Sequence, residues 1–133
     1  MDLGLGGKRA LVTGGSRGIG RAIAEALVKD GCAVAICARN AAEVAQAVAD
    51  LEALGGGKAY GGVADVADTP SVEAWVAGSA ALMGGVDIVV ANVSALSGAP
   101  GEASWRLALE IDMLGTLRTV EAALPYLERS DCG

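Results

Sequence analysis

Short apolar segments rich in valine and alanine alternate along the chain with longer segments in which apolar residues recur every three or four positions. The short segments predict β-strands and the longer ones predict amphipathic helices. The predicted strands are Lys8–Thr13, Ala33–Ala38, Lys58–Val63 and Val86–Ala91, and the predicted helices are Gly18–Lys29, Ala41–Leu54, Thr69–Met83 and Ala103–Glu128. This order predicts an α/β fold, with right-handed crossovers and a mainly parallel, doubly wound sheet, in a single domain spanning residues 1–133.

Residues that cap or break helices mark the boundaries of these segments. Asn40, with Glu43 three residues later, is typical of a helix N-terminus, and Thr69 before Pro70 predicts a second helix start with Thr69 as the cap. Pro125 predicts a kink or a stop near the end of the last helix. The periodicity of the first helix places Ile19, Ile23, Ala26 and Leu27 on one face.

Composition and charge narrow the class of protein. The net charge of −6 argues against a nucleic-acid partner, which needs a basic face. The apolar segments are too short to span a bilayer, and the first residues lack the basic start and long apolar region of a secretory signal. We therefore expect a cytoplasmic protein with neither a nucleic-acid nor a membrane partner.

Histidine is absent, which removes the commonest general base and the commonest metal ligand. The acidic residues do not cluster as a metal site would require. The three cysteines form no C-x-x-C motif, and an odd number suits free thiols in a reducing compartment. No metal is expected.

The stretch TGGSRGIG, Thr13–Gly20, lies at the first predicted strand-to-helix turn. In a doubly wound sheet this turn holds the phosphates of a nucleotide, because the helix start offers unpaired N–H groups and glycine allows a close backbone approach. The stretch lacks the Lys-Ser or Lys-Thr of a Walker loop, and its spacing differs from G-x-G-x-x-G. Its placement, more than its glycines, predicts a nucleotide site.

The pattern T-G-x-x-x-G-x-G, together with most of the chain, resembles the short-chain dehydrogenase/reductase family, in particular its 3-oxoacyl-ACP reductase-like members. The resemblance implies a Rossmann-like βαβαβαβα fold that here lacks the C-terminal strands and helices of the full family fold. It also implies a dinucleotide cofactor. The candidate cofactor-binding residues are Gly14, Ser16, Arg17, Gly18, Ile19, Gly20, Arg39, Asp65, Val66 and Asn92.

Arg39 follows the second predicted strand, where the family selects its cofactor. An acidic residue there binds the ribose hydroxyls of NAD, whereas Arg39 offers a planar fork of donors suited to a 2′-phosphate, and Arg17 could clamp the same group. The resemblance therefore implies NADP(H) in preference to NAD(H). The alternative is that Arg39 is a solvated surface residue.

Two further motifs follow the third and fourth strands. In the family an Asp-Val pair, here Asp65 and Val66, contacts the adenine; without the family, Asp65 is a turn residue. Asp87–Ser94, DIVVANVS, resembles D-I-L-V-N-N-A-G, with Asn92 on the second Asn and Ser94 in place of Gly. Asn92 as a plain turn residue is the alternative.

The last predicted helix resembles the family segment that carries V-N-L-x-G. Trp105 and the stretch EIDMLGT, Glu110–Thr116, align with it, but Asp112 replaces the family's Asn, and we do not assign it a catalytic role. The family's catalytic Ser and Tyr-x-x-x-Lys are absent, since neither Tyr60 nor Tyr126 is followed by Lys four residues later. We therefore assign no catalytic residue in this chain.

The last helix carries a broad apolar face, which in the family is a dimerisation surface. Its residues are Leu107, Ile111, Leu114, Leu117, Val120 and Leu124. This face predicts a homo-oligomer formed through helix 103–128, or a covalent remainder of the fold that covers it.

These features favour an NADP(H)-dependent oxidoreductase that moves a hydride between nicotinamide and a small-molecule carbonyl or alcohol, represented by its cofactor-binding half. The fragment alone is expected to be inactive. The alternatives are a non-catalytic dinucleotide-binding module, a folding or interaction fragment, and, more weakly, a methyltransferase, which the loop spacing and Arg39 disfavour.

Overall fold

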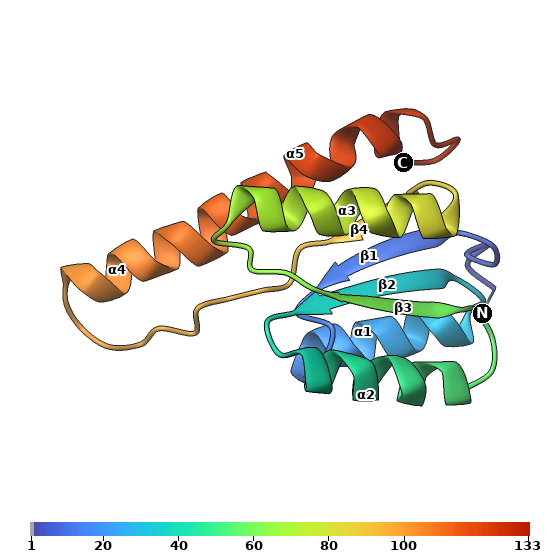
Figure 1. The fold of residues 1–133 in the computed structure, drawn as a ribbon, viewed down its shortest axis with the longest axis horizontal. Coiled ribbons are helices and arrows are strands. Elements are labelled where there is room, and N and C mark those ends of the chain that lie inside the picture. The colour runs from blue at the N-terminus through green and yellow to red at the C-terminus, as the bar shows by residue number, and fades with distance from the viewer. Residues whose placement is uncertain (1) are drawn as a thin grey trace.

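The structure is a computed structural model that describes residues 2–133, in which parallel strands form one sheet in the order β3-β2-β1-β4. The strands are β1 (Arg9–Thr13), β2 (Ala33–Ala38), β3 (Ala59–Val63) and β4 (Ile88–Val90). The helices are α1 (Gly18–Lys29), α2 (Ala41–Ala53), α3 (Thr69–Met83), α4 (Glu102–Ala108), the π-helix η1 (Leu109–Leu114) and α5 (Gly115–Glu128). The predicted doubly wound parallel sheet is confirmed (Figure 1).

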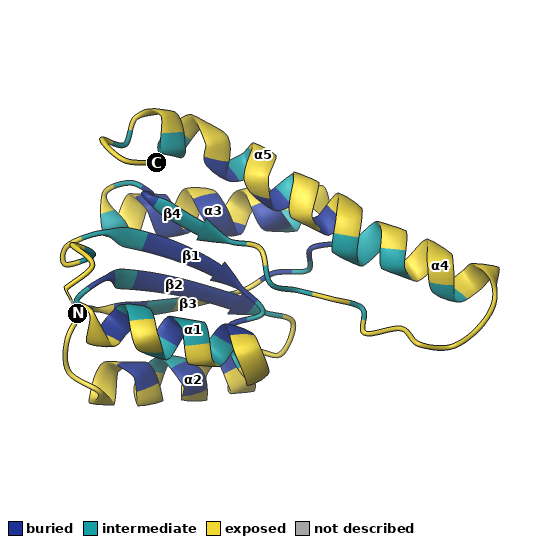
Figure 2. Cartoon of the chain, turned by 180° about the vertical axis from the view of Figure 1, so that it is seen from behind, coloured by how far each residue is buried: buried dark blue, intermediate teal, exposed yellow. Residues whose placement is uncertain are grey.

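Helices cover both faces of the sheet (Figure 1). Because successive strand residues point to opposite faces, Val12 and Ile36 pack in the layer of α1 and α2, while Leu11 and Ala35 pack in the layer of α3 and α5. Strands β1 and β2 are buried almost throughout, whereas α4 projects beyond the sheet and is largely exposed (Figure 2). The core therefore lies around β1 and β2.

The prediction of one continuous α-helix over Ala103–Glu128 is wrong in the middle of that range. It consists of α4, η1 and α5, because six residues, Leu109–Leu114, adopt the wider π-helical turn. Within this region the Thr116 hydroxyl donates to the Asp112 carbonyl at 2.7 Å. Pro125 does not stop the helix, which continues to Glu128.

The apolar face predicted for the first helix packs on the core only in part: Ile23 and Leu27 contact the core, whereas Ile19 and Ala26 are exposed. The buried residues of α1 are Gly20, Ala24 and Val28, while the side chain of Ile19 is 75% exposed. The reason is that Gly20 must lie against the end of β1, which fixes the rotation of the helix about its axis.

The helix caps follow the sequence more closely. Asn40 caps α2 as predicted, with its side chain accepting from the Glu43 N–H at 3.1 Å. The cap of α3 is Asp68 and not Thr69, because the Asp68 carboxylate accepts from the Ser71 N–H at 3.2 Å. A carboxylate at this position also interacts favourably with the positive end of the helix dipole.

Asp87 joins distant parts of the chain at the edge where the strands begin. Its carboxylate accepts from Nε and Nη2 of Arg9, both at 2.9 Å, and from the Arg9 N–H at 2.9 Å. The Ser130 hydroxyl, beyond α5, donates to the same carboxylate at 2.6 Å. The Arg9 hydrogen bonds hold the pKa of Asp87 well below its usual range, against the opposing effect of burial.

Asp87→Asn should lower the free energy of unfolding at pH 7 by about 1–3 kcal/mol, because it weakens the charge-assisted bonds and leaves the Arg9 guanidinium without a carboxylate partner. Because the folded-state pKa lies below the unfolded value of about 3.9, this stabilisation is present above about pH 4 and is lost as the pH falls further. Urea unfolding between pH 2 and 7 measures both effects.

The matched control is Asp50→Asn, which breaks an exposed pair with Arg21 that measures 3.4 Å. It should change stability by less than about 0.5 kcal/mol, with the acid dependence unaltered. An Asp87→Asn variant as stable as the native chain, with the same acid dependence, would show that the buried link contributes nothing.

Candidate functional site

The loop between β1 and α1 depends on glycine at three positions. Gly14 and Gly18 have φ values of +65° and +61°, in the left-handed region that favours glycine. At Gly20 a Cβ would lie 2.3 Å from the Gly14 carbonyl oxygen and 2.5 Å from Nδ2 of Asn92. Helix α1 therefore starts in direct contact with the end of β1 only because residue 20 has no side chain.

Asn92, which lies two residues beyond the end of β4, holds this loop. Its Nδ2 donates to the Thr13 carbonyl at 3.2 Å and to the Gly14 carbonyl at 3.4 Å. Its N–H donates to the hydroxyl of the buried Thr13 at 3.0 Å, and that hydroxyl donates to the Val90 carbonyl at 3.4 Å. Thr13 is not among the residues predicted for the site, although a polar residue at the end of an apolar strand indicates such a role.

The first turn of α1 is left open to an anion. The N-cap residue, Arg17, makes no side-chain cap hydrogen bond, and the turn contains no acidic residue. Arg17, Gly18 and Ile19 are all exposed, and Ser16 is half-buried. The unpaired N–H groups and the positive end of the helix dipole therefore remain available at this edge of the sheet.

Arg39 lies beside the same loop. The β1–β2 register pairs Thr13 with Cys37, and the Gly15 N–H donates to the Cys37 carbonyl at 3.2 Å. Arg39 lies only two residues after Cys37 and is therefore close to the glycine loop. Its side chain is exposed, and within residues 2–133 no carboxylate forms an ion pair with Arg39 or Arg17. Burial raises the pKa of the Cys37 thiol to about 12, so this neighbour is neutral at physiological pH.

The Asp65–Val66 turn follows β3 at the same edge. One Asp65 carboxylate oxygen accepts from the Ala67 N–H at 2.9 Å, which is the role of a turn residue. The Val66 side chain is buried in the core, and its carbonyl accepts from Nη1 of Arg118 at 3.0 Å. Any contact of Val66 with a ligand must therefore come from its backbone. Arg118 is not among the residues predicted for the site, although a basic residue within a largely apolar helix indicates a specific contact.

Asp112 holds the loop that follows β4. Its carboxylate accepts from the Ala95 N–H at 2.9 Å, in a loop where Leu96 has a φ of +49°. Between this loop and α4 lies a hollow of about 320 Å³, lined by Ser97, Gly98, Ala99, Ser104, Trp105 and Ala108. The Asp112 carboxylate is thus engaged in holding the loop.

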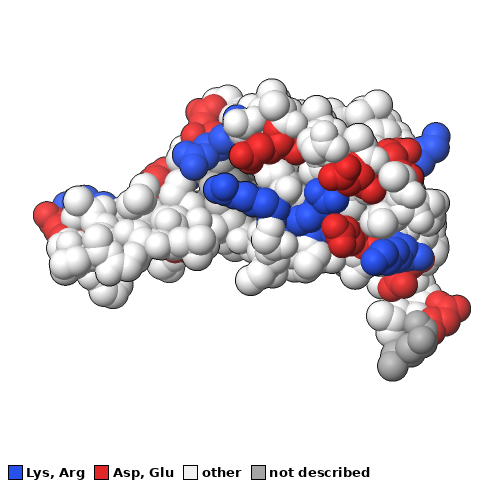
Figure 3. Space-filling view, turned by 90° about the horizontal axis from the view of Figure 1, so that it is seen from below, with Lys and Arg blue, Asp and Glu red and all other residues white. Residues whose placement is uncertain are grey.

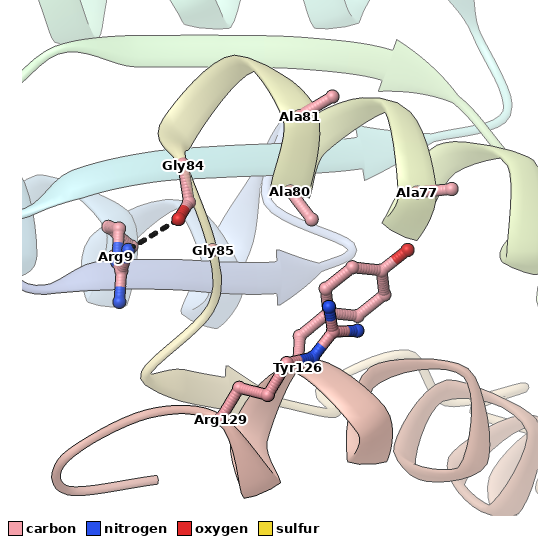
Figure 4. A pocket seen from close by; sticks show the side chains of 8 residues that line it. All are labelled: Arg9, Ala77, Ala80, Ala81, Gly84, Gly85, Tyr126 and Arg129. Atoms are coloured by element: carbon pink, nitrogen blue, oxygen red, sulfur yellow. Dashed lines mark hydrogen bonds between the residues drawn. The ribbon is translucent and has the colours of Figure 1, made fainter.

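A second hollow, of about 340 Å³, lies at the opposite edge, where the strands begin (Figure 4). Tyr126 lines it, with the Arg129 guanidinium 5.0 Å from the centre of its ring, and Arg9 donates to the Gly84 carbonyl at 2.7 Å. Because Arg9 starts β1 and the glycine loop follows the end of β1, Tyr126 is remote from the candidate site.

The face of the molecule that α1 and α2 form carries side chains of both charge signs (Figure 3). On this face acidic and basic side chains are interspersed, and they are sparser on the projecting arm (Figure 3). That arm carries the exposed ion pair of Arg106 with Glu102. Residues 2–133 contain no group of three or more His, Cys, Asp or Glu placed to hold a metal ion. None of the helices described is long and apolar enough to cross a membrane.

Comparison with known proteins identifies the family. The sequence profile of the short chain dehydrogenase family matches residues 8–133, so the chain belongs to that family. An isoepoxydon dehydrogenase of Penicillium expansum is 34% identical over 132 residues, which are 98% of this chain and 51% of that protein.

Solved structures agree with this assignment. An alcohol dehydrogenase from the archaeon Thermococcus sibiricus, complexed with 5-hydroxy-NADP, is similar with a TM-score of 0.83 and 35% identity over 92% of this chain and 54% of its own. L-sorbose reductase from Gluconobacter frateurii, complexed with NADPH and L-sorbose, has a TM-score of 0.86 and 30% identity over 97% of this chain and 51% of its own. The chain spans about half the length of these proteins.

Gly20→Ala should lower the free energy of unfolding by about 1–3 kcal/mol, because the new methyl group displaces the Gly14 carbonyl and the Asn92 amide. Gly78→Ala is the matched control, since it adds the same methyl group inside α3 with no atom within 4 Å. That variant should be up to about 1 kcal/mol more stable than the native chain. Equal stabilities for the two variants, measured by urea unfolding, would contradict the close approach at Gly20.

Proposed function

We propose that the edge formed by the glycine loop, Arg39 and the Asp65–Val66 turn binds NADP(H). The observation that carries this proposal is the start of α1, where Gly20 permits direct contact with β1 and the first turn has neither a capping side chain nor an acidic residue. Such a turn binds the pyrophosphate of a dinucleotide through backbone N–H groups.

The other candidate residues take roles around this centre. Gly14 and Gly18 shape the loop, Ser16 and Ile19 border it, and Asn92 fixes it from the segment after β4. Asp65 and the Val66 backbone receive the adenine. Arg39 and Arg17 bind the 2′-phosphate, a role favoured by their exposure beside the loop and by the NADP complexes among the similar structures.

We infer that the complete protein is a short-chain reductase acting on a small-molecule carbonyl or alcohol, of which this chain is the cofactor-binding half. The cofactor would donate a hydride to a carbonyl or, in its oxidised form, accept one from an alcohol, and the residues described here bind and orient that cofactor. The hollow between α4 and the loop after β4 supports a place for substrate beside the cofactor. A non-catalytic dinucleotide-binding module is less favoured, because the relatives are named as dehydrogenases and reductases.

The exposed apolar face of the last helices supports self-association. Trp105 is 72% exposed and Met113 64%, and Leu117, Val120 and Leu124 continue the face along α5. Much of this helical arm is exposed (Figure 2). An apolar patch of this kind is typical of a protein interface. We propose a homo-oligomer formed through residues 103–128.

Arg39→Asp should weaken NADPH binding by about tenfold or more while leaving NADH binding unchanged or stronger, because the new carboxylate repels the 2′-phosphate and accepts from ribose hydroxyls. Fluorescence titration of both cofactors measures the two dissociation constants. Arg106→Asp on α4 is the control and should alter neither. An unchanged ratio of the two constants in Arg39→Asp would refute the role of Arg39.

Leu117→Glu and Leu124→Glu should shift the chain from oligomer to monomer, since a charge on the apolar face must be desolvated in the interface. Sedimentation velocity measures the change. The control is Leu82→Glu, which places the same charge on an exposed leucine of α3 outside this face. A native chain that sediments as a monomer would refute the proposed homo-oligomer.

A further inference from the structure

Arg118 makes a set of contacts that join two segments of the candidate site. Its Nη1 donates to the Val66 carbonyl at 3.0 Å and to the Glu110 carbonyl at 3.2 Å, and its Nη2 donates to the Glu110 carboxylate at 2.5 Å. The side chain is only 18% exposed, so solvent screens these charge-assisted bonds weakly. The guanidinium therefore bridges the turn after β3 to the π-helix η1.

The bridge coincides with close packing at the same place. Gly115 ends the π-helical segment and is buried against Val66, where a Cβ would lie 2.9 Å from Val66 Cγ2. The Glu110 carbonyl also accepts from the Gly115 N–H, so Arg118 binds a carbonyl that closes the wider turn. Val66 is therefore contacted twice: its side chain packs against Gly115 at the end of the π-helical turn, and its carbonyl accepts from Arg118.

The bonds within the Asp65–Val66 turn set its shape, whereas its position depends on contacts with other elements. Locally, the Asp65 carboxylate accepts from the Ala67 N–H, and the Asp65 N–H donates to the hydroxyl of Ser71 in α3 at 3.0 Å. The Ala64 N–H donates to the Ala38 carbonyl at 3.1 Å and ties the start of the turn to the end of β2. On the side of η1 and α5, Arg118 supplies the hydrogen bond to the turn.

We propose that Arg118 is a positioning residue for the adenine end of the dinucleotide, an inference that rests on the proposed function. It holds the Asp65–Val66 turn against η1, so that the Asp65 carboxylate stays where it can accept from the adenine amino group. A guanidinium suits this role because its rigid fork reaches two acceptors at once, whereas a Lys ammonium is a point donor on a flexible stem.

The expected effect is a loss of base discrimination and not a general loss of binding. When a turn occupies its binding-competent position only part of the time, the apparent affinity for the group it reads falls in proportion. The glycine loop is fixed separately, by Gly20 and Asn92, so the pyrophosphate contacts should survive. Hypoxanthine carries a carbonyl oxygen in place of the amino group of adenine, so replacing adenine by hypoxanthine removes the donor from which the Asp65 carboxylate would accept.

The experiment compares NADPH with its hypoxanthine analogue by fluorescence titration of the 133-residue chain and its variants. The native chain should prefer NADPH by about tenfold, the difference made by one hydrogen bond to a charged acceptor. In Arg118→Ala this preference should fall to within about twofold, because the dissociation constant for NADPH rises and that for the analogue changes little. Arg106→Ala, which removes an exposed Arg–Glu pair of α4, should keep the native preference.

The other possible results test either the role of Arg118 or the proposed function. If Arg118→Ala does not fold, Arg118→Lys replaces it and should also lose part of the preference. A preference that survives in the folded variant overturns the role of Arg118, as does a native chain that binds both dinucleotides equally. A native chain that binds neither dinucleotide overturns the proposed function itself. An equal loss of affinity for both dinucleotides assigns Arg118 a purely structural role.

Discussion

The contact between the start of α1 and the end of β1 is the constraint on which the rest of the structure depends. Gly20 lies so close to the Gly14 carbonyl and the Asn92 amide that any side chain would force them apart. This contact sets the rotation of α1, which buries Ala24 and Val28 and leaves Ile19 at the surface. It also brings the open first turn of the helix to the edge where β1, β2 and β3 end.

The two edges of the sheet are built differently, and the difference supports the proposed position of the dinucleotide. At the edge where the strands begin, Asp87 is saturated by Arg9 and Ser130, which fasten the sheet to the segment after α5. At the other edge, backbone N–H groups and two exposed arginines are left without carboxylate partners within residues 2–133. The polar groups of the first edge stabilise the fold, and those of the second are available for a ligand.

Much of this arrangement could be predicted from sequence because it is local. Strand and helix periodicity, the Asn40 cap and the glycine spacing each depend on residues close together in the chain. The positions that sequence reasoning missed depend on distant partners: Asp87 and Arg9 are 78 residues apart, and Arg118 and Val66 are 52 apart. The sequence around one residue of each pair contains no pattern that identifies its distant partner.

The π-helical turn shows the same limit in another form. A broad apolar face tolerates one extra residue in a turn without losing its periodicity, so the stretch around Asp112 was predicted as an ordinary helix. In the structure this turn packs on the Asp65–Val66 segment and holds the loop after β4. Its position explains how helices far from the glycine loop still shape the candidate site.

The most direct test of the account is to map NADPH binding by two-dimensional amide NMR of the ¹⁵N-labelled chain. The account predicts saturable shifts in the amides of Gly14–Gly20, Arg39 and Asp65–Val66, with little change at Arg9 and Arg129. Shifts concentrated around Arg9, Tyr126 and Arg129, or no shifts at all, would contradict the assignment of the dinucleotide site to the edge where the strands end.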